Sequence, residues 1–526
     1  MKKIVLFLCM LTALFNLSCD KEALLDQPLQ GRQQLDDFFS SEENAELFVN
    51  GIYRKINGES WWQVNFQRQI NEMATDDNWA GNTRQPRPDI TGIAQYNVFP
   101  GSTYFNSFWE SHYIGITRAN ISLDRIPEVD FDENKKNRLF AEAKFLRAFF
   151  YFDLVRNFGG VPIVESYNEI LQPTINDKER SSVEEVYAFI EADLKEAINN
   201  LPLKSEYAAS DLGRVTKGAA QSLLAKVYLY EEKWAQAQAM ALNVVQSGEY
   251  SLESDFANIY KVGNAHGMES IFEVEYINNP TFQEIGGQFS ITNGSRGDRG
   301  WGWCSPSSDL ENAFLREGDD IRLRSTIIKH GDPVFGDPDV TEFDGEPSEN
   351  KSGRTNRKYY TPVADRPEPY ARGQIPGSYI HIRLADVILI HAEAAYFNGD
   401  ETSAINSLEM VRDRVELDTN MSLSGDALRD AIWKERRLEL ALEQHRLYDI
   451  RRQKINGVPR IALILGPDGS FVKYNTEVST DPFETTNLLE SQDSGSLFDP
   501  NIHMVWPVPP EEIQLSRGKI VQNPGY

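Results

Sequence analysis

The chain has helical segments that occur in pairs, and this pairing limits its fold more than any other feature of the sequence. In the clearest pair, apolar residues recur at helical spacing from Ala219 to Tyr228, before a short break at residues 231–233. A second helix follows at once and carries apolar residues on one face up to Val245, with Gly248 as a stop signal. Two amphipathic helices joined by so short a turn must pack against each other.

Small residues stand at the positions where these two helices approach, and the arrangement resembles a tetratricopeptide unit. The Gly and Tyr signature positions of that repeat are not recognisable, so the resemblance is to its architecture. Further helices are predicted at residues 138–158, 183–198, 379–398, 401–415 and 426–452. Such units bury their apolar faces only against neighbours. We therefore expect a mostly α fold, with a scaffold of tetratricopeptide-like helix pairs at about residues 41–249 and 378–455.

Two stretches of the chain show little helical period, at about residues 250–377 and 456–526. Both are rich in Gly, Pro, Asp and aromatic residues. Loops of this length inside a folded chain tend to be functional. We therefore expect a single domain over residues 19–526, in which the scaffold presents a loop-rich face to a ligand or a partner.

The N-terminus indicates where the protein works. Lys2 and Lys3 precede an apolar run at residues 4–15, and Ser18 and Cys19 follow in a pattern that resembles a bacterial lipoprotein signal. The run is too short to remain as a membrane-spanning helix. We expect residues 1–18 to be a removed signal peptide and Cys19 to carry the lipid, with an ordinary secretory signal as the alternative. The acidic residues after Cys19 resemble the surface-export tags of Bacteroidetes lipoproteins.

Charge and cysteine content exclude two further possibilities. The chain has 79 acidic and 53 basic residues, and its net charge of -26 would repel a nucleic acid. Of the three cysteines, Cys9 leaves with the signal peptide and Cys19 is the expected lipidation site. Only Cys304 remains, so no intrachain disulfide can form and stability must come from burial of a core.

Several short motifs occur in order along the whole chain. They are Phe145-Leu146-Arg147-Ala148 with residues 158–162, residues 383–390 with 392–394, residues 435–440 with Glu443, His445-Arg446 and 449–451, and residues 506–509 with 522–526. Together with the lipoprotein signal, they resemble the signature of SusD/RagB-type outer-membrane lipoproteins.

This resemblance implies a surface-exposed lipoprotein of the outer membrane that binds its ligand and does not cleave it. It implies an oligosaccharide ligand and, as partner, a TonB-dependent outer-membrane transporter of the SusC type on which the protein sits as a lid. A peptide-binding member of the same family is the alternative, and it would favour a deeper acidic cleft over a flat aromatic platform.

Most of the charged signature residues are interpreted as structural. Glu435, Arg436 and Glu439 recur at intervals of three and four residues, the spacing at which opposite charges pair on a helix. Asp386 lies on an apolar helix, where an acid usually pairs with an arginine such as Arg383 or one from a neighbouring helix. Trp109 also has helical neighbours and is expected in the core, as are Trp61 and Trp62.

No catalytic motif was found. The chain has no H-E-x-x-H, G-x-S-x-G, G-x-x-x-x-G-K-[ST] or G-x-G-x-x-G pattern. A surface glycoside hydrolase stays a weaker alternative, because it would need only two suitably spaced carboxylates. The acidic loop at residues 332–344 lacks the glycine register of a calcium-binding EF-hand. We expect neither a metal nor a cofactor.

Two aromatic, glycine-rich segments are the candidates for ligand binding. Sugars stack their C–H faces on exposed rings and offer hydroxyls to short polar groups, and such residues occur here as Asp77, Trp79 and Asn82. The second segment places Trp301 and Trp303 among glycines. We predict these five residues as the ligand site. The alternative for any single tryptophan is that it packs a loop onto the scaffold.

Overall fold

The computed structural model describes residues 35–57, 70–81, 88–277, 288–345, 352–368, 375–486 and 494–526. The predicted signal peptide, the predicted lipidation site Cys19, the pair Trp61 and Trp62, and Asn82 lie outside these residues. The described part of the chain is mostly helical, as the sequence predicted. Within it, no helix combines the length and the apolar character needed to cross a membrane.

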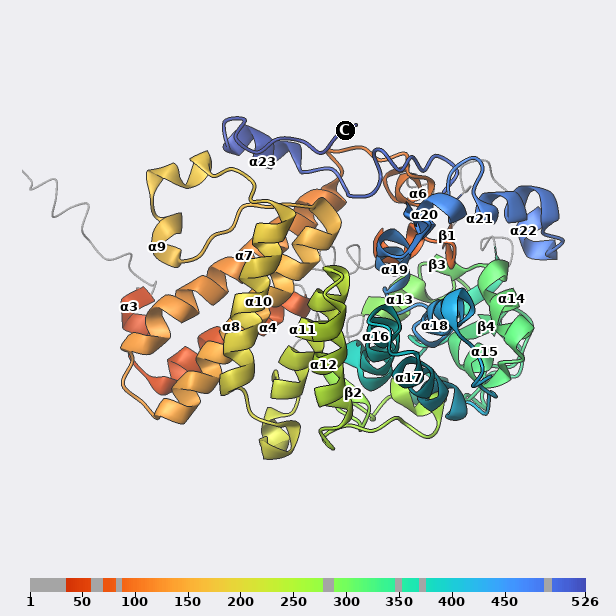
Figure 1. Cartoon of the computed structure of the whole chain (residues 1–526), viewed down its shortest axis with the longest axis horizontal. Coiled ribbons are helices and arrows are strands. Elements are labelled where there is room, and N and C mark those ends of the chain that lie inside the picture. Colours follow the sequence, from red (N-terminus) through yellow and green to blue (C-terminus); the bar gives the residue numbers. More distant parts are fainter. Residues whose placement is uncertain are drawn as a thin grey trace, which may run out of the picture.

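Successive helices of the scaffold pack side by side along the molecule (Figure 1). They are α3 (Leu35–Phe38), α4 (Glu42–Asn57), α7 (Thr103–Arg125), α8 (Glu133–Phe158), α10 (Val183–Asn200), α11 (Lys217–Tyr230), α12 (Trp234–Val245), α16 (Leu384–Phe397), α17 (Glu401–Asp413), α18 (Gly425–Glu439) and α19 (Arg446–Arg452). Helices α8 and α16 are buried on nearly all sides, because each lies between neighbours. The predicted pair at residues 217–245 is confirmed as α11 and α12.

Side-chain caps begin several of these helices where the sequence allows them. The Asp132 carboxylate accepts from the Lys135 backbone N–H, so α8 begins earlier than the predicted residue 138. Ser182 and Glu185 form a capping box at the start of α10. At its other end, α8 stops at Gly159, whose φ of 74° few other residues adopt readily.

One predicted helix begins too early. Residues 377–383 form strand β6 (Gly377–Arg383), which pairs antiparallel with β2 (Ser270–Tyr276), and only from Leu384 onward is the segment helical. Ile380 and Ile382 of β6 are buried, as is typical of residues in a strand. The partner strand β2 lies about a hundred residues earlier in the chain. A periodicity within residues 379–398 could not reveal it.

The long helix predicted at residues 426–452 is also divided. Helix α18 ends at Glu439 and α19 begins at Arg446, with Leu442 and Gln444 at φ values of 63° and 66° between them. This backbone places Glu443 against the buried Lys358 ammonium, at 2.5 Å.

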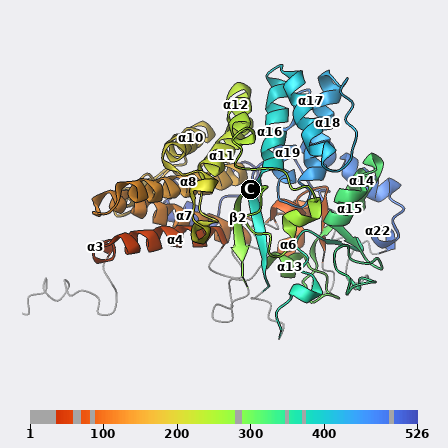
Figure 2. The ribbon, with the colours of Figure 1, turned by 90° about the horizontal axis from the view of Figure 1, so that it is seen from below.

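Short strands and helices occur in the stretches that were predicted to be irregular and also between the helices of the scaffold. The strands are β1 (Asn78–Gly81) paired with β3 (Trp303–Pro306), β4 (Ile327–Lys329) with β5 (Arg354–Asn356), and β7 (Lys454–Ile455) with β8 (Val458–Pro459). The helices are α6 (Pro88–Gln95), α9 (Tyr167–Ile170), α13 (Gln288–Asn293), α14 (Ser308–Glu317), α15 (Asp320–Thr326), α20 (Arg460–Ile464), α21 (Ser470–Lys473), α22 (Pro482–Thr486) and α23 (Pro510–Leu515). Figure 2 shows β2 and α13 on the side opposite α16 to α18.

A buried ion-pair network joins these loops to the scaffold, as the structural interpretation of the signature charges predicted. The Arg383 guanidinium lies 2.5 Å from Glu439, 2.7 Å from Glu269 and 2.8 Å from Glu443. The pairs therefore cross between elements rather than run along one helix. Asp386 pairs with Lys226 at 2.6 Å and with Arg436 at 3.2 Å. The suggested pair of Asp386 with Arg383 is thus wrong, while pairing with a neighbouring helix is confirmed.

Candidate functional site

The two segments predicted for ligand binding lie side by side. Strands β1 and β3 pair antiparallel, with Trp79 opposite Ser305 and Gly81 opposite Trp303. The Ser307 N–H donates to the Asp77 carbonyl at 2.8 Å and continues the contact past the strand end. More than 200 residues separate the segments in the chain, so the pairing brings together what the sequence suggested only as two separate candidates.

The rings on these strands point into the protein. Trp79 is 1% exposed, and its indole N–H donates to Glu484 Oε1 at 2.9 Å. Its ring also packs against Phe471, with centroids 5.6 Å apart. Trp303 is 4% exposed. In this structure neither ring offers a face to a ligand. Both rings pack inside the protein, which is the alternative that the sequence left open for each tryptophan.

Asp77 is buried as well, in a cluster of two acids and two arginines. Its carboxylate lies 2.7 Å from Arg437 Nε, and the neighbouring Asp76 accepts two hydrogen bonds from Arg446 at 2.8 and 2.7 Å. Burial would raise the pKa of Asp76, but Arg437 and Arg446 outweigh it and hold that pKa well below its usual range. Asp77 therefore anchors the β1 segment to the break between α18 and α19.

Trp301 differs from the other two tryptophans because its side chain is partly exposed. A compact loop fixes it: the Trp301 N–H donates to Ile291 on α13 at 2.7 Å, and the Gly302 N–H donates to Gly294 at 2.8 Å. A Cβ on Gly300 would lie 2.0 Å from the Gly294 carbonyl oxygen, so only glycine fits there. These glycines do not lift the rings from packing as predicted, because Trp301 is partly buried against the main hydrophobic core and Trp303 belongs to that core.

A crevice lined by tyrosines lies beside the Trp301 loop, and sequence reasoning missed it. We call it the tyrosine crevice; it is lined by Tyr260, Val262, Tyr276, Ser290, residues 358–361 and residues 376–378. Tyr276, Tyr359 and Tyr360 are only 7 to 9% exposed, so little of each residue is accessible from solvent. The Tyr359-Tyr360 doublet inside a loop-rich stretch was the available signal.

Direct contacts join the tyrosine crevice to the Trp301 loop. Ser290 on α13 lies 3.1 Å from Thr361, hydroxyl to hydroxyl. Arg366 donates to both carboxylate oxygens of Asp298 at 2.7 and 2.8 Å, and its guanidinium lies over the Tyr360 ring at 5.2 Å. The crevice encloses only about 20 Å³, far below the roughly 300 to 1,000 Å³ of ligand pockets, and it adjoins the loop that carries Trp301.

Hydrogen bonds to Asp337, from inside and outside the loop, hold the acidic loop at residues 332–344 in place. Asp337 accepts from the Tyr360 hydroxyl at 2.8 Å, from the Val363 N–H at 2.9 Å and from the Asp339 N–H at 3.1 Å. Burial would raise the pKa of Asp337, but these hydrogen bonds outweigh it and lower that pKa. The described residues contain no group of three or more His, Cys, Asp or Glu side chains arranged for a metal ion.

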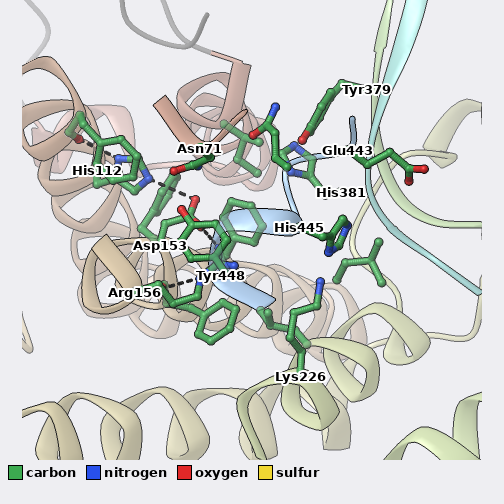
Figure 3. Close-up of a pocket in the computed structure, with 18 of the residues that line it drawn as sticks. Asn71, His112, Asp153, Arg156, Lys226, Tyr379, His381, Glu443, His445 and Tyr448 are labelled. Atoms are coloured by element: carbon green, nitrogen blue, oxygen red, sulfur yellow. Dashed lines mark hydrogen bonds and ion pairs between the residues drawn. The ribbon is translucent and has the colours of Figure 1, made fainter. Parts of the chain in front are cut away.

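An interior cavity lies where the scaffold meets β6 and the break after α18 (Figure 3). Its volume of about 80 Å³ is far below the roughly 300 to 1,000 Å³ of ligand pockets. Polar side chains from several helices surround it, among them His112, which lies 3.3 Å from Asp153. Burial and the nearby Lys226 lower the pKa of His445 to about 3, so this ring stays neutral. The cavity suits a few ordered waters that bridge polar groups.

Comparison with known proteins yields one consistent group of relatives. A family model described as "SusD family" matches residues 268–526, and one described as "Starch-binding associating with outer membrane" matches residues 25–229. The SusD-like protein P2 of Formosa agariphila is 27% identical, over 93% of this chain and 94% of the relative. A SusD-like protein of Bacteroides ovatus is 24% identical, over 89% of each chain.

Solved structures of the same group share the fold. A laminarin-binding SusD-like protein is 28% identical with a TM-score of 0.75, and the match covers 93% of this chain and 100% of the other. A SusD-like protein from Bacteroides fragilis is 25% identical with a TM-score of 0.75, over 94% of this chain and 100% of the other. The similarity therefore extends over the helical scaffold and the loop-rich face together.

Proposed function

From the premise that the chain belongs to the SusD family of non-catalytic, glycan-binding surface proteins, we propose that it captures oligosaccharides and delivers them to a SusC-like TonB-dependent transporter. In this proposal the protein is a surface-exposed lipoprotein of the outer membrane, held by a lipid on Cys19. The family description of association with the outer membrane supports this location.

The open surface formed by Trp301 and the tyrosine crevice is the proposed glycan site. The observation that supports it is the position of the partly exposed Trp301, on a loop fixed by backbone hydrogen bonds, near the tyrosine crevice with its hydroxyls and the Arg366 guanidinium. Sugars need that combination, because their C–H faces stack on rings while their hydroxyls pair with polar groups. Since a relative of known structure is named for laminarin binding, laminarin is the first ligand to test.

Calorimetric titration of the mature protein tests the proposal. We expect binding of laminarin oligosaccharides or of another glycan in a panel that includes malto-oligosaccharides, without release of reducing ends during prolonged incubation. A mixed peptide library serves as the competing ligand class. Binding of peptides with no binding of any glycan would identify the peptide-binding alternative, and release of reducing ends would identify a hydrolase.

The proposed transporter contact rests on two exposed apolar side chains, one between α6 and α7 and one on the C-terminal segment. Phe99 is 73% exposed and Leu497 is 54% exposed, and the Leu497 N–H donates to Gln95 four residues before Phe99. Apolar side chains grouped in this way are typical of interaction surfaces. Detergent extraction and pull-down should recover a TonB-dependent barrel with the native protein and less of it with the variant Phe99→Glu/Leu497→Glu. Equal recovery with both would exclude this surface.

A further inference from the structure

A second pocket lies far from the proposed glycan surface in the fold. It occupies about 290 Å³ between α7, the segment at residues 162–178 and the C-terminal residues 512–520. In Figure 1 these elements lie together, with α23 above α7 and α9 at its side. The volume is close to the lower limit of small-molecule pockets, so it suits a ligand with about one ring.

Apolar side chains form most of the walls of this pocket, which we call the α7–α23 pocket. They are Trp109, Tyr113, Ile114, Pro162, Val164, Ile175, Leu515 and Ile520. The floor is rigid, because Trp109 packs edge-on against Phe158 at 5.1 Å and the Tyr113 hydroxyl donates to the Pro162 carbonyl at 2.7 Å. A preformed apolar pocket loses little free energy to ordering when a ligand enters.

The charges around the pocket are not balanced. Lys178 lines it, but its ammonium already contacts Glu169 and the Ile163 carbonyl. Glu110 and Glu512 also line it, and within the described residues neither has an ion-pair partner. Burial raises the pKa of Glu512, and the nearby Glu110 carboxylate adds to this effect against a hydrogen bond from Trp109. The uncompensated charge at the pocket is therefore negative.

We propose that the α7–α23 pocket binds a small apolar molecule that carries a primary ammonium group. The apolar body lies against Tyr113, Ile114 and Leu515, and the ammonium lies between the Glu110 and Glu512 carboxylates. An ammonium supplies the positive charge that these carboxylates lack, and a hydrogen bond between two charged groups is stronger than one between neutral groups. The pocket shares no lining residue with the tyrosine crevice, so this binding is independent of glycan capture.

Paired probes test the proposal on the full mature protein at pH 7.5. Phenethylamine carries a ring and an ammonium, and 2-phenylethanol has the same ring and chain without the charge. We expect phenethylamine to bind at least tenfold more tightly in a calorimetric or ligand-observed NMR titration, because a hydrogen bond to a charged group is worth about 1.4 kcal/mol or more. Equal binding of the two probes, or no binding of either, would overturn the proposal.

Two neighbouring variants distinguish the pocket from general electrostatics. Glu512→Gln keeps the shape of the side chain and should reduce phenethylamine affinity at least tenfold. Glu511→Gln makes the same change of charge on the same helix, but Glu511 does not line the pocket and instead accepts from Asn106 at 2.6 Å. It should change the affinity less than about twofold. Equal effects of the two variants would contradict a specific site.

Glycan titration and thermal melting of both variants complete the test. Both should melt like the parent protein and bind the cognate glycan unchanged, because neither residue contacts the Trp301 surface. If Glu512→Gln melts like the parent and still prefers phenethylamine over the alcohol, the assignment of the ammonium to Glu512 is wrong. Loss of glycan binding in both variants would instead contradict the independence of the two sites.

Discussion

Trp301 and Trp79 carry the same side chain in different environments, and the difference sets how much of each residue a ligand can reach. Trp301 is partly exposed on a loop fixed to α13, whereas Trp79 is 1% exposed and donates to Glu484. A ring can contribute to binding only through a face that a ligand can reach. At the residue scale, burial and not residue type separates a ligand contact from a packing contact.

Trp301→Ala is therefore expected to weaken glycan binding. By analogy with bases stacked on aromatic side chains, loss of the ring should cost about 1 to 3 kcal/mol, or roughly five- to a hundredfold in affinity. The thermal midpoint should change little because the side chain is not fully buried. Calorimetric titration beside thermal melting measures both quantities, and unchanged affinity would remove Trp301 from the site.

Trp79→Ala is expected to behave in the opposite way. The change empties a core position and leaves Glu484 without the indole donor, so it should cost about 3 to 5 kcal/mol of unfolding free energy. Urea denaturation measures this loss. The folded fraction should bind glycan with nearly the parent affinity, and a variant that keeps its stability but loses binding would show that Trp79 reaches the ligand in another conformation.

At the scale of elements, the buried charges decide where secondary structure stops. The left-handed turn at Leu442 and Gln444 ends one helix so that Glu443 can pair with Lys358 and Arg383. Arg383 is the last residue of β6, and its ion pair with Glu439 holds that strand end beside α18. Removing one partner of such a pair leaves an uncompensated buried charge, which typically costs about 3 to 5 kcal/mol.

Acid sensitivity tests the role of Glu443. Burial would raise its pKa, but Arg383 and Lys358 outweigh this effect and lower the pKa from 4.5 to about 2. A lowered pKa in the folded state stabilises the protein above the unfolded value near 4.3, and this stabilisation is lost as the pH falls toward 2. The loss should approach about 3 kcal/mol, since one pKa unit is about 1.4 kcal/mol.

Glu443→Gln should accordingly be less stable than the parent at pH 7 and should lose less stability between pH 5 and pH 2. Urea denaturation at several pH values measures both slopes. The exposed Glu43→Gln is a matched control, because Glu43 lies on the surface of α4. If the stability of Glu443→Gln depends on pH in the same way as that of the parent, the ion pairs of Glu443 do not lower its pKa in the folded protein.

At the scale of the whole molecule, the proposed attachment to the membrane is through the N-terminus. The described residues include no helix able to span a bilayer, and the predicted lipid site is Cys19. Because an acyl chain on Cys19 is the proposed anchor, Cys19→Ala should abolish acylation and release the protein from the outer-membrane fraction. Fractionation followed by immunoblotting measures the change. Retention of the variant in outer-membrane vesicles would contradict the lipoprotein interpretation.

Local signals in the sequence determined the helix pairs and the family. Apolar residues at helical spacing, caps such as Ser182 and stops such as Gly159 act within a few residues, so α8, α10, α11 and α12 could be predicted from the sequence alone. The structural role of the signature charges could also be predicted, because charges at a mostly buried helix face need partners. The partner of each charge could not be predicted from the sequence.

Tertiary structure decided the features that depend on distant residues. Strand β6 exists because β2 lies beside it, and Glu443, in the break after α18, pairs with Lys358, which lies 85 residues earlier in the chain. The burial of Trp79 likewise depends on Phe471 and Glu484, about 400 residues away. A sequence pattern predicts the structure that depends on interactions between residues near one another in the chain. Contacts with distant parts of the chain decide which aromatic ring is exposed to solvent. These contacts are known only from the tertiary structure.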